Sequence, residues 1–236
     1  MRSMKNLLWA AAVLVTSAVS FADAPATPAT PAAAPAPPVQ DAATTAKVVT
    51  DVQAFYNRTT TFSSDFDQEY LVKAYNQTKT SQGHVVFSKP GKMDWTYSSP
   101  AGNHVVSDGT TLKAYEAANK QMYQQTINQS QYPAALSFLL GNGQLSTLFN
   151  FTMRDGADLS FPGGWVLLGD PIQATPAYTK VVFYVDKQTS QVMRVLILDG
   201  QGNRNRFTFT NAQVNLPVLP TQFQYTPPPG TTVINP

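Results

Sequence analysis

Alternation of apolar and polar residues is the feature that most limits the fold of this chain. It recurs in short segments from about Thr61 to Asn211, separated by turns such as Ser107-Asp108-Gly109. Successive side chains of a strand point to opposite faces, so each segment predicts a β-strand with one apolar face. Connections this short leave no room for the crossover helices of parallel strands. We therefore expect a mainly β fold, one antiparallel sheet of about ten or eleven strands.

The segment between Phe87 and Pro100, FSKPGKMDWTYSSP, raises a question about function. Met93, Trp95 and Tyr97 alternate in it with polar residues only. One face of this strand therefore carries three large apolar side chains, which pack either in a core or against a ligand.

Two helices are expected beside the sheet. The first runs from about Asp41 to Asn57, and its apolar residues recur at helical spacing: Val48, Val52, Phe55 and Tyr56. The second lies within Pro133 to Phe149, where Leu136, Leu139 and Leu140 share one face. A sheet of this size must close on itself or cover its apolar face, and the helices are the available cover.

The N-terminus has the pattern of a secretory signal peptide over residues 1–22. Arg2 and Lys5 precede an apolar run from Leu7 to Val19, and Ser20-Phe21-Ala22 supplies a cleavage site. Residues 23–40 consist almost entirely of Ala, Pro and Thr, which predicts a disordered linker. Residues 41–236 then form one domain. We expect an exported, soluble protein.

Composition excludes several classes of function. The chain has no Cys, so we expect neither disulfides nor a lipid anchor on the mature protein. Removal of Arg2 and Lys5 lowers the Lys and Arg count from 16 to 14, equal to the 14 Asp and Glu residues. A neutral chain without a basic tract is a poor binder of nucleic acid.

Catalytic and metal-binding patterns are weak. The chain has two His, and no Cys to complete a zinc site with them. Asp65, Asp67 and Glu69 share one strand face, as the solvated side of a sheet often does. Ser, His and Asp occur without a nucleophile elbow or an ordered partner set. We expect no catalytic residues, no metal and no cofactor.

Four motifs in order resemble the periplasmic outer-membrane lipoprotein carriers of the LolA family: GHVVFSKPGKMDWTY, HVVSDGTTLKAYEAANKQ, VLILDGQGNRNRFTFTN and FQYTPPPGTTV. The resemblance spans about Ala43 to Val233. It implies an unclosed antiparallel half-barrel whose concave apolar face is covered by short α-helices acting as a lid. It also implies a periplasmic carrier that accepts triacylated lipoproteins from an inner-membrane ABC-type releasing complex and delivers them to an outer-membrane acceptor or the outer membrane itself.

The same resemblance assigns roles to residues. The acyl cavity would be lined by Met93, Trp95, Tyr97, Val85, Phe87, Phe66, Tyr70 and Val72. The lid would pack through Val48, Val52, Phe55, Leu136, Leu139 and Leu140. Lys89 stands where the family usually has an Arg that hydrogen-bonds the lid, so a looser latch is expected. Full burial of an acyl chain contributes about 0.8 kcal/mol per CH₂, so a carrier needs a lid that moves.

Two alternatives remain at this point. A periplasmic lipid- or lipoprotein-sensing regulatory module of the same fold would share the apolar face. Such modules usually add a second, smaller domain, and on that ground the carrier is favoured. A carboxylate-based hydrolase would instead lose activity on changing Asp65 or Asp67.

Overall fold

The computed structural model describes residues 38–127 and 143–235. Its α-helices are α1 (Ala42–Arg58) and α3 (Leu145–Leu148), and its 3₁₀ turns are η2 (Lys73–Tyr75), η5 (Ala157–Leu159) and η6 (Pro220–Phe223). Its strands are β1 (Thr61–Val72), β2 (Gln77–Ser88), β3 (Lys92–Ser99), β4 (Ala101–Asp108), β5 (Thr111–Glu116), β6 (Gln121–Thr126), β7 (Phe149–Asp155), β8 (Gly164–Pro171), β9 (Lys180–Asp186), β10 (Val192–Leu198), β11 (Arg204–Val214) and β12 (Thr232–Ile234).

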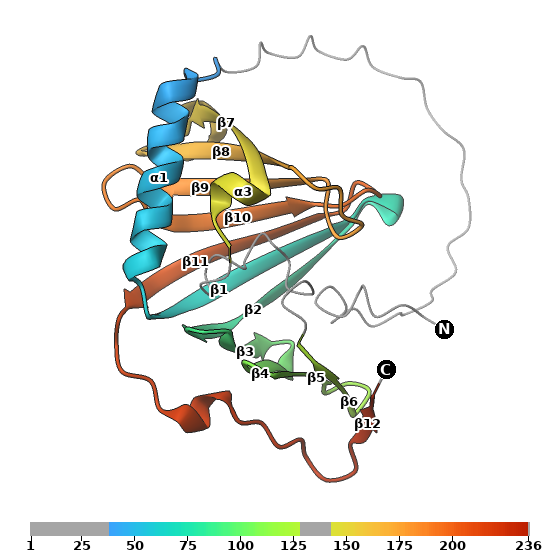
Figure 1. Cartoon of the computed structure of the whole chain (residues 1–236). Coiled ribbons are helices and arrows are strands. Elements are labelled where there is room, and N and C mark those ends of the chain that lie inside the picture. Colours follow the sequence, from blue (N-terminus) through green and yellow to red (C-terminus); the bar gives the residue numbers. More distant parts are fainter. Residues whose placement is uncertain (1–37, 128–142, 236) are drawn as a thin grey trace, which may run out of the picture.

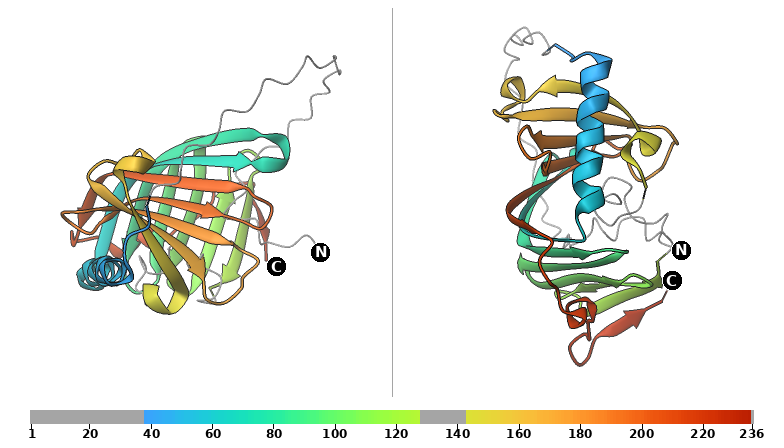
Figure 2. Two further views of the ribbon diagram at one scale, coloured as in Figure 1. Left: turned by 90° about the horizontal axis from the view of Figure 1, so that it is seen from above. Right: turned by 60° about the vertical axis from the view of Figure 1, so that its left-hand side comes forward.

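All described strands belong to one sheet in the order β12-β6-β5-β4-β3-β2-β1-β11-β10-β9-β8-β7. β12 and β7 end the sheet without pairing to each other, so the barrel is unclosed, as predicted. Figure 2 shows how the sheet curls to make one concave side. Two details differ from the prediction: the strands number twelve, and β12 pairs with β6 in parallel. The extra strand was missed because Pro227 to Pro229 separate only a short extended piece from the rest.

Helix α1 forms at the predicted place and covers one part of the concave side. Asp41 caps its first turn, since its Oδ1 accepts a hydrogen bond from the Thr44 backbone N–H at 2.9 Å. Figure 1 shows α1 crossing β7–β11 near one end of these strands, whereas the β1–β2 turn lies at the far end. The predicted apolar stripe is buried between helix and sheet: Val48, Val52, Phe55 and Tyr56.

The convex side of β3–β5 is covered by the segment that follows β11. Phe223 of η6 is buried, and the Lys113 ammonium donates a hydrogen bond to the Tyr225 carbonyl at 2.9 Å. Beneath this segment Asp94 accepts hydrogen bonds from His104 Nε2 and Gln222 Nε2. Asp94 is only 3% exposed, so the polar face of β3 is not the solvated surface that its alternation indicated.

The described chain begins at the end of the predicted linker, and Val39 already pairs with Arg154 of β7. The Gln40 N–H also donates to the Met153 carbonyl at 2.8 Å. The signal peptide and most of the linker, residues 1–37, lie outside the described residues. Within the described ranges, no helix has the length and apolar character required to cross a bilayer.

Candidate functional site: an aromatic concave face under a helix

Six aromatic side chains form a continuous apolar surface in the middle of the concave side, which we call the aromatic floor. Neighbouring ring centroids lie 4.9 to 6.5 Å apart, mostly edge to face or tilted. Such packing adds about 0.5–1.5 kcal/mol per pair to the burial of the rings. The floor comprises Phe62 and Phe66 of β1, Phe87 of β2, Trp95 of β3, and Phe207 and Phe209 of β11.

Strand alternation and pairing register bring these rings together. Phe62 is paired with Phe87 across β1 and β2, and Phe66 is paired with Phe209 across β1 and β11. Gly83 is the cross-strand partner of Phe66 on β2. A Cβ on Gly83 would lie 2.8 Å from the Phe66 ring and 2.2 Å from the Thr96 carbonyl oxygen, so only glycine lets this ring lie flat over β2.

The structure places the predicted cavity residues in two groups. Phe66, Val85, Phe87, Met93 and Trp95 are buried in one cluster with Val48, Val52 and Phe55 of α1, and Tyr97 packs against that cluster. Tyr70 and Val72 lie outside it, half-buried toward the β1–β2 turn. Leu136, Leu139 and Leu140 lie outside the described residues.

Lys89 contacts α1, a contact that the family resemblance implied. Its ammonium donates a hydrogen bond to the Tyr56 carbonyl in the last turn of the helix. That carbonyl also accepts a hydrogen bond from the Thr59 N–H at 3.1 Å, which caps the helix. Burial lowers the pKa of Lys89. One cation therefore joins the end of β2 to the end of α1.

Tyr56 fixes the same end of α1 from its other side. Its hydroxyl oxygen accepts a hydrogen bond from the Val192 backbone N–H of β10 at 3.1 Å. Burial raises the pKa of Tyr56, so the phenol stays neutral. The last turn of α1 is thus held on both halves of the sheet.

A cleft of about 460 Å³ lies between α1, α3 and β7. Its walls include Val49, Gln53 and Asn57 of the helix, and Phe149 and Phe151 of the strand. The Leu145 N–H of α3 donates to Gln53 Oε1 at 2.8 Å on this side.

An open sheet with an aromatic concave side and a helix held over it matches a known family. The sequence model of the family described as outer membrane lipoprotein carrier protein LolA matches residues 57–226, well over half of the chain. The chain belongs to the LolA family.

Individual relatives agree with this membership. An outer-membrane lipoprotein carrier protein of Nitrosomonas europaea is 24% identical over 193 residues, covering 80% of this chain and 89% of its own. One from Albidiferax ferrireducens is 30% identical over 201 residues, covering 78% of this chain and 88% of its own. An uncharacterized conserved protein of Thermus thermophilus shares the fold, with a TM-score of 0.52, 12% identity, and coverage of 82% of this chain and 99% of its own.

Half of the floor of this LolA-family chain was not among the predicted cavity residues. Phe207 and Phe209 alternate within NRFTFTN just as Met93 and Trp95 do within MDWTY, so the pattern was visible. Phe62 likewise shares strand parity with Phe66. The pairing of β1 with β11, which places these rings beside Trp95, could not be predicted from the sequence pattern.

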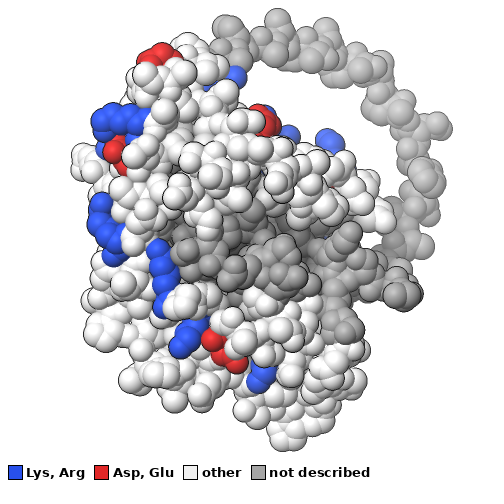
Figure 3. All heavy atoms as spheres, viewed as in Figure 1, with Lys and Arg blue, Asp and Glu red and all other residues white. Residues whose placement is uncertain are grey.

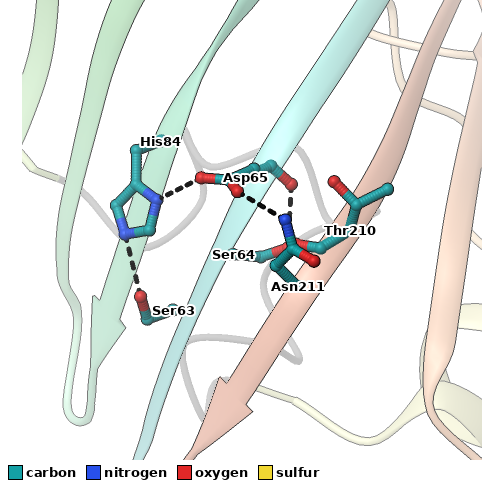
Figure 4. Close-up of polar contacts among 6 residues, drawn as sticks. All are labelled: Ser63, Ser64, Asp65, His84, Thr210 and Asn211. Atoms are coloured by element: carbon teal, nitrogen blue, oxygen red, sulfur yellow. Dashed lines mark hydrogen bonds and ion pairs between the residues drawn. The ribbon is translucent and has the colours of Figure 1, made fainter.

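The convex side carries an arrangement that no sequence pattern predicted. Ser63 Oγ lies 2.8 Å from His84 Nε2, and His84 Nδ1 lies 2.8 Å from Asp65 Oδ1 (Figure 4). Asn211 donates to the other Asp65 oxygen at 2.9 Å, and this bond is the largest cause that lowers the pKa of Asp65. We expected no ordered set of Ser, His and Asp side chains, and the hydrogen bonds among Ser63, His84 and Asp65 show that this expectation was wrong.

This Ser63–His84–Asp65 set nevertheless lacks the surroundings of an active site. The His84 and Asp65 side chains are 49% and 51% exposed, whereas hydrolytic triads act in water-excluded sites. The continuous β1–β2 register pairs Asp65 with His84, and a bulge in β11 opposite Ser64 brings Asn211 to the same carboxylate, which explains the contacts structurally. Among the described residues, no group of three or more His, Cys, Asp and Glu is placed to hold a metal ion.

Proposed function

We propose that this protein is a periplasmic carrier that binds the acyl chains of lipoproteins and moves them from the inner to the outer membrane. The observation that carries the proposal is the aromatic floor, an apolar surface at the centre of an unclosed sheet that shares one buried cluster with the apolar side of α1. Relatives of similar length are outer-membrane lipoprotein carrier proteins, which supports the same function.

Cargo binding would replace one apolar cover of the aromatic floor by another. In this structure Val48, Val52 and Phe55 of α1 share one buried apolar cluster with the floor. An acyl chain offers the floor a similar surface at about 25 cal/mol per Å² buried. Because cargo then displaces the helix instead of filling an empty space, only the difference between the two contacts appears as affinity. Binding stays weak enough for release.

The partners follow from this proposal. Triacylated lipoproteins are the cargo, an inner-membrane ABC-type complex releases them, and an outer-membrane acceptor or the membrane itself receives them. Residues 1–22 direct export and residues 23–40 act as a tether. Charged side chains are few on the face seen in Figure 3, and many of them lie along the flank beside α1, with others at its upper and lower parts.

We assign binding rather than chemistry to the protein. The floor presents carbon and ring surfaces, and its charged neighbour Lys89 is occupied by the Tyr56 carbonyl. The Ser63–His84–Asp65 set lies on the opposite side of β1 from Phe66, because odd and even residues of a strand face opposite sides.

A release assay tests the carrier function. Spheroplasts making a triacylated lipoprotein are incubated with purified residues 23–236, and the supernatant is examined for a soluble complex. The same lipoprotein with its acylated cysteine replaced is the cargo control. Release of the acylated form alone supports the proposal, and its absence with an active releasing complex refutes it.

Photo-crosslinking locates the bound chain. A benzophenone amino acid in place of Trp95 should crosslink the released lipoprotein. The same group in place of Tyr184, whose ring packs on Phe161 on the convex side at 5.5 Å, should not. Equal crosslinking from both positions would remove the floor as the binding surface.

A further inference from the structure

Three polar side chains interrupt the apolar concave side next to the aromatic floor: Gln68 of β1, Tyr97 of β3 and Asn205 of β11. We call them the polar trio. Gln68 Nε2 donates to Asn205 Oδ1 at 2.9 Å, and the Tyr97 hydroxyl lies 3.5 Å from Gln68 Oε1. Gln68 is 8% exposed and Asn205 is 2% exposed. Burial raises the pKa of Tyr97 to about 12, so its phenol remains a neutral donor.

The trio is built into the same surface as the floor. Gln68 follows Phe66 by two residues on β1, Asn205 precedes Phe207 by two on β11, and each pair therefore shares a face. Tyr97 packs its ring edge on Phe66 at 5.2 Å and crosses β2 at Gly83, its cross-strand partner. The polar atoms thus continue the floor directly.

Hydrogen-bonding capacity in the trio exceeds its use. Among the described residues, Asn205 engages only its carbonyl oxygen, and its Nδ2 group, which is not fully buried, keeps two N–H donors accessible. Gln68 Nε2 has a second N–H beyond the one given to Asn205. Because these donors stay accessible on an otherwise apolar face, a ligand acceptor at this position can form hydrogen bonds with them.

The trio also has a direction relative to α1. From Phe62 through Phe66 to Gln68, β1 runs from the end of the sheet where α1 and Lys89 meet toward the β1–β2 turn (Figure 1). An alkyl chain lying on the floor with its methyl end under α1 would therefore bring its head to the trio. A long-chain ester carries at that point a carbonyl oxygen, an acceptor for N–H and O–H donors.

We propose that Gln68, Tyr97 and Asn205 form a subsite for the ester carbonyl of a long-chain acyl glycerol group, and so discriminate acyl esters from other apolar chains. The inference rests on the proposed carrier function and adds the identity and orientation of the ligand head. The floor supplies affinity for any long chain. The trio supplies preference for a chain that ends in a carbonyl.

A matched pair of probes isolates this carbonyl. 1-Palmitoylglycerol and 1-hexadecylglycerol have the same sixteen-carbon chain and the same glycerol head, but only the ester has the carbonyl oxygen. Each displaces a hydrophobic fluorescent dye from purified residues 23–236. We expect the ester to compete about fivefold better, which corresponds to ~1 kcal/mol, the net value of one hydrogen bond.

Variants then assign the preference to the trio. In Gln68→Met with Asn205→Leu, both amides are replaced by apolar groups of similar size, and we expect the two probes to compete equally. Gln82→Met is the control, because Gln82 lies on β2 with its amide hydrogen-bonded to Asp67 at 2.8 Å on the convex side. This control should keep the fivefold ratio. Far-UV circular dichroism and dye binding without competitor establish that each variant is folded.

The outcomes separate this inference from the carrier function. Displacement by both probes with equal potency in the wild type overturns the subsite and leaves the carrier proposal standing. A preference that persists in the double variant overturns the assignment to the trio. Failure of both probes to displace dye, together with no lipoprotein release by spheroplasts, refutes the carrier function itself.

Discussion

Replacement of Lys89 by Met tests whether one hydrogen bond holds α1 over the floor. Met keeps much of the length of the Lys stem but removes the ammonium that donates to the Tyr56 carbonyl. The Thr59 N–H continues to cap that carbonyl, so α1 should still form. The expected change is in the equilibrium between α1 packed on the sheet and α1 lifted from it.

The magnitude follows from the nature of the bond. Hydrogen bonds from charged donors contribute roughly 1.5–3 kcal/mol net. Burial of Lys89 opposes its charge, as the lowered pKa indicates, so the lower end of that range applies. A loss of about 1.5 kcal/mol raises the opening equilibrium constant roughly tenfold.

Absence of cysteine makes opening measurable. The chain has no Cys, so Val52→Cys introduces a single thiol at a position that is 1% exposed beneath α1. When lifting of the helix is fast and reversible, the rate of thiol labelling is proportional to the opening equilibrium constant. Lys89→Met should therefore speed labelling of Cys at position 52 about tenfold in native buffer.

A matched variant controls for general loosening. Lys113 also donates a buried hydrogen bond to a backbone carbonyl, that of Tyr225, but on the convex side. Lys113→Met should leave the labelling rate unchanged. Equal acceleration by both variants, or none by Lys89→Met, would refute the latch. Urea denaturation of each variant distinguishes lifting of α1 from global unfolding.

Further predictions concern the floor and its border. Gly83→Ala should destabilise the protein by about 1–3 kcal/mol in urea denaturation, because the new methyl would overlap the Thr96 carbonyl oxygen, 2.2 Å away. If Gly83→Ala unfolded at the same urea concentration as the wild type, the predicted overlap would be refuted. Burial raises the pKa of Tyr97 from 10.0 to about 12, so its stabilisation is complete below pH 10 and is lost as pH rises through 12. Between pH 10 and pH 12 the free energy of unfolding of the wild type should fall by about 3 kcal/mol more than that of Tyr97→Phe. Equal decreases in the two proteins would contradict the raised pKa of Tyr97.

The strands were predictable because the local pattern and the final fold agree. Alternation located MDWTY and FNFTMRD within a residue or two of β3 and β7. The Asp108-Gly109 turn was equally predictable, since Gly109 has a φ of +97°, a conformation that glycine adopts without strain. Strand parity likewise placed Lys89 on the face of Phe87, from which it contacts α1.

Features that depend on distant residues were not predictable. Asp94 is buried because Gln222 and the segment around it return over the convex side, and nothing near MDWTY signals this cover. His84 meets Ser63 and Asp65 only through the β1–β2 register, and Asn211 reaches Asp65 from a bulge in β11. Periodicity describes one strand at a time, whereas these contacts depend on how strands far apart in the chain come together.

During folding, the complete aromatic floor can form only after β1 has paired with β11. The Ser64 hydroxyl donates to the Thr210 carbonyl, a contact between residues 146 positions apart, and Phe207 and Phe209 come from the same late strand. Hairpins β1 to β6 can form as the chain emerges, but their aromatic face has no neighbour on the β11 side until residue 214 follows. Non-local sheets of this kind fold slowly. The apolar surface proposed to accept lipid is thus exposed on the nascent chain first, in a state that is prone to aggregation.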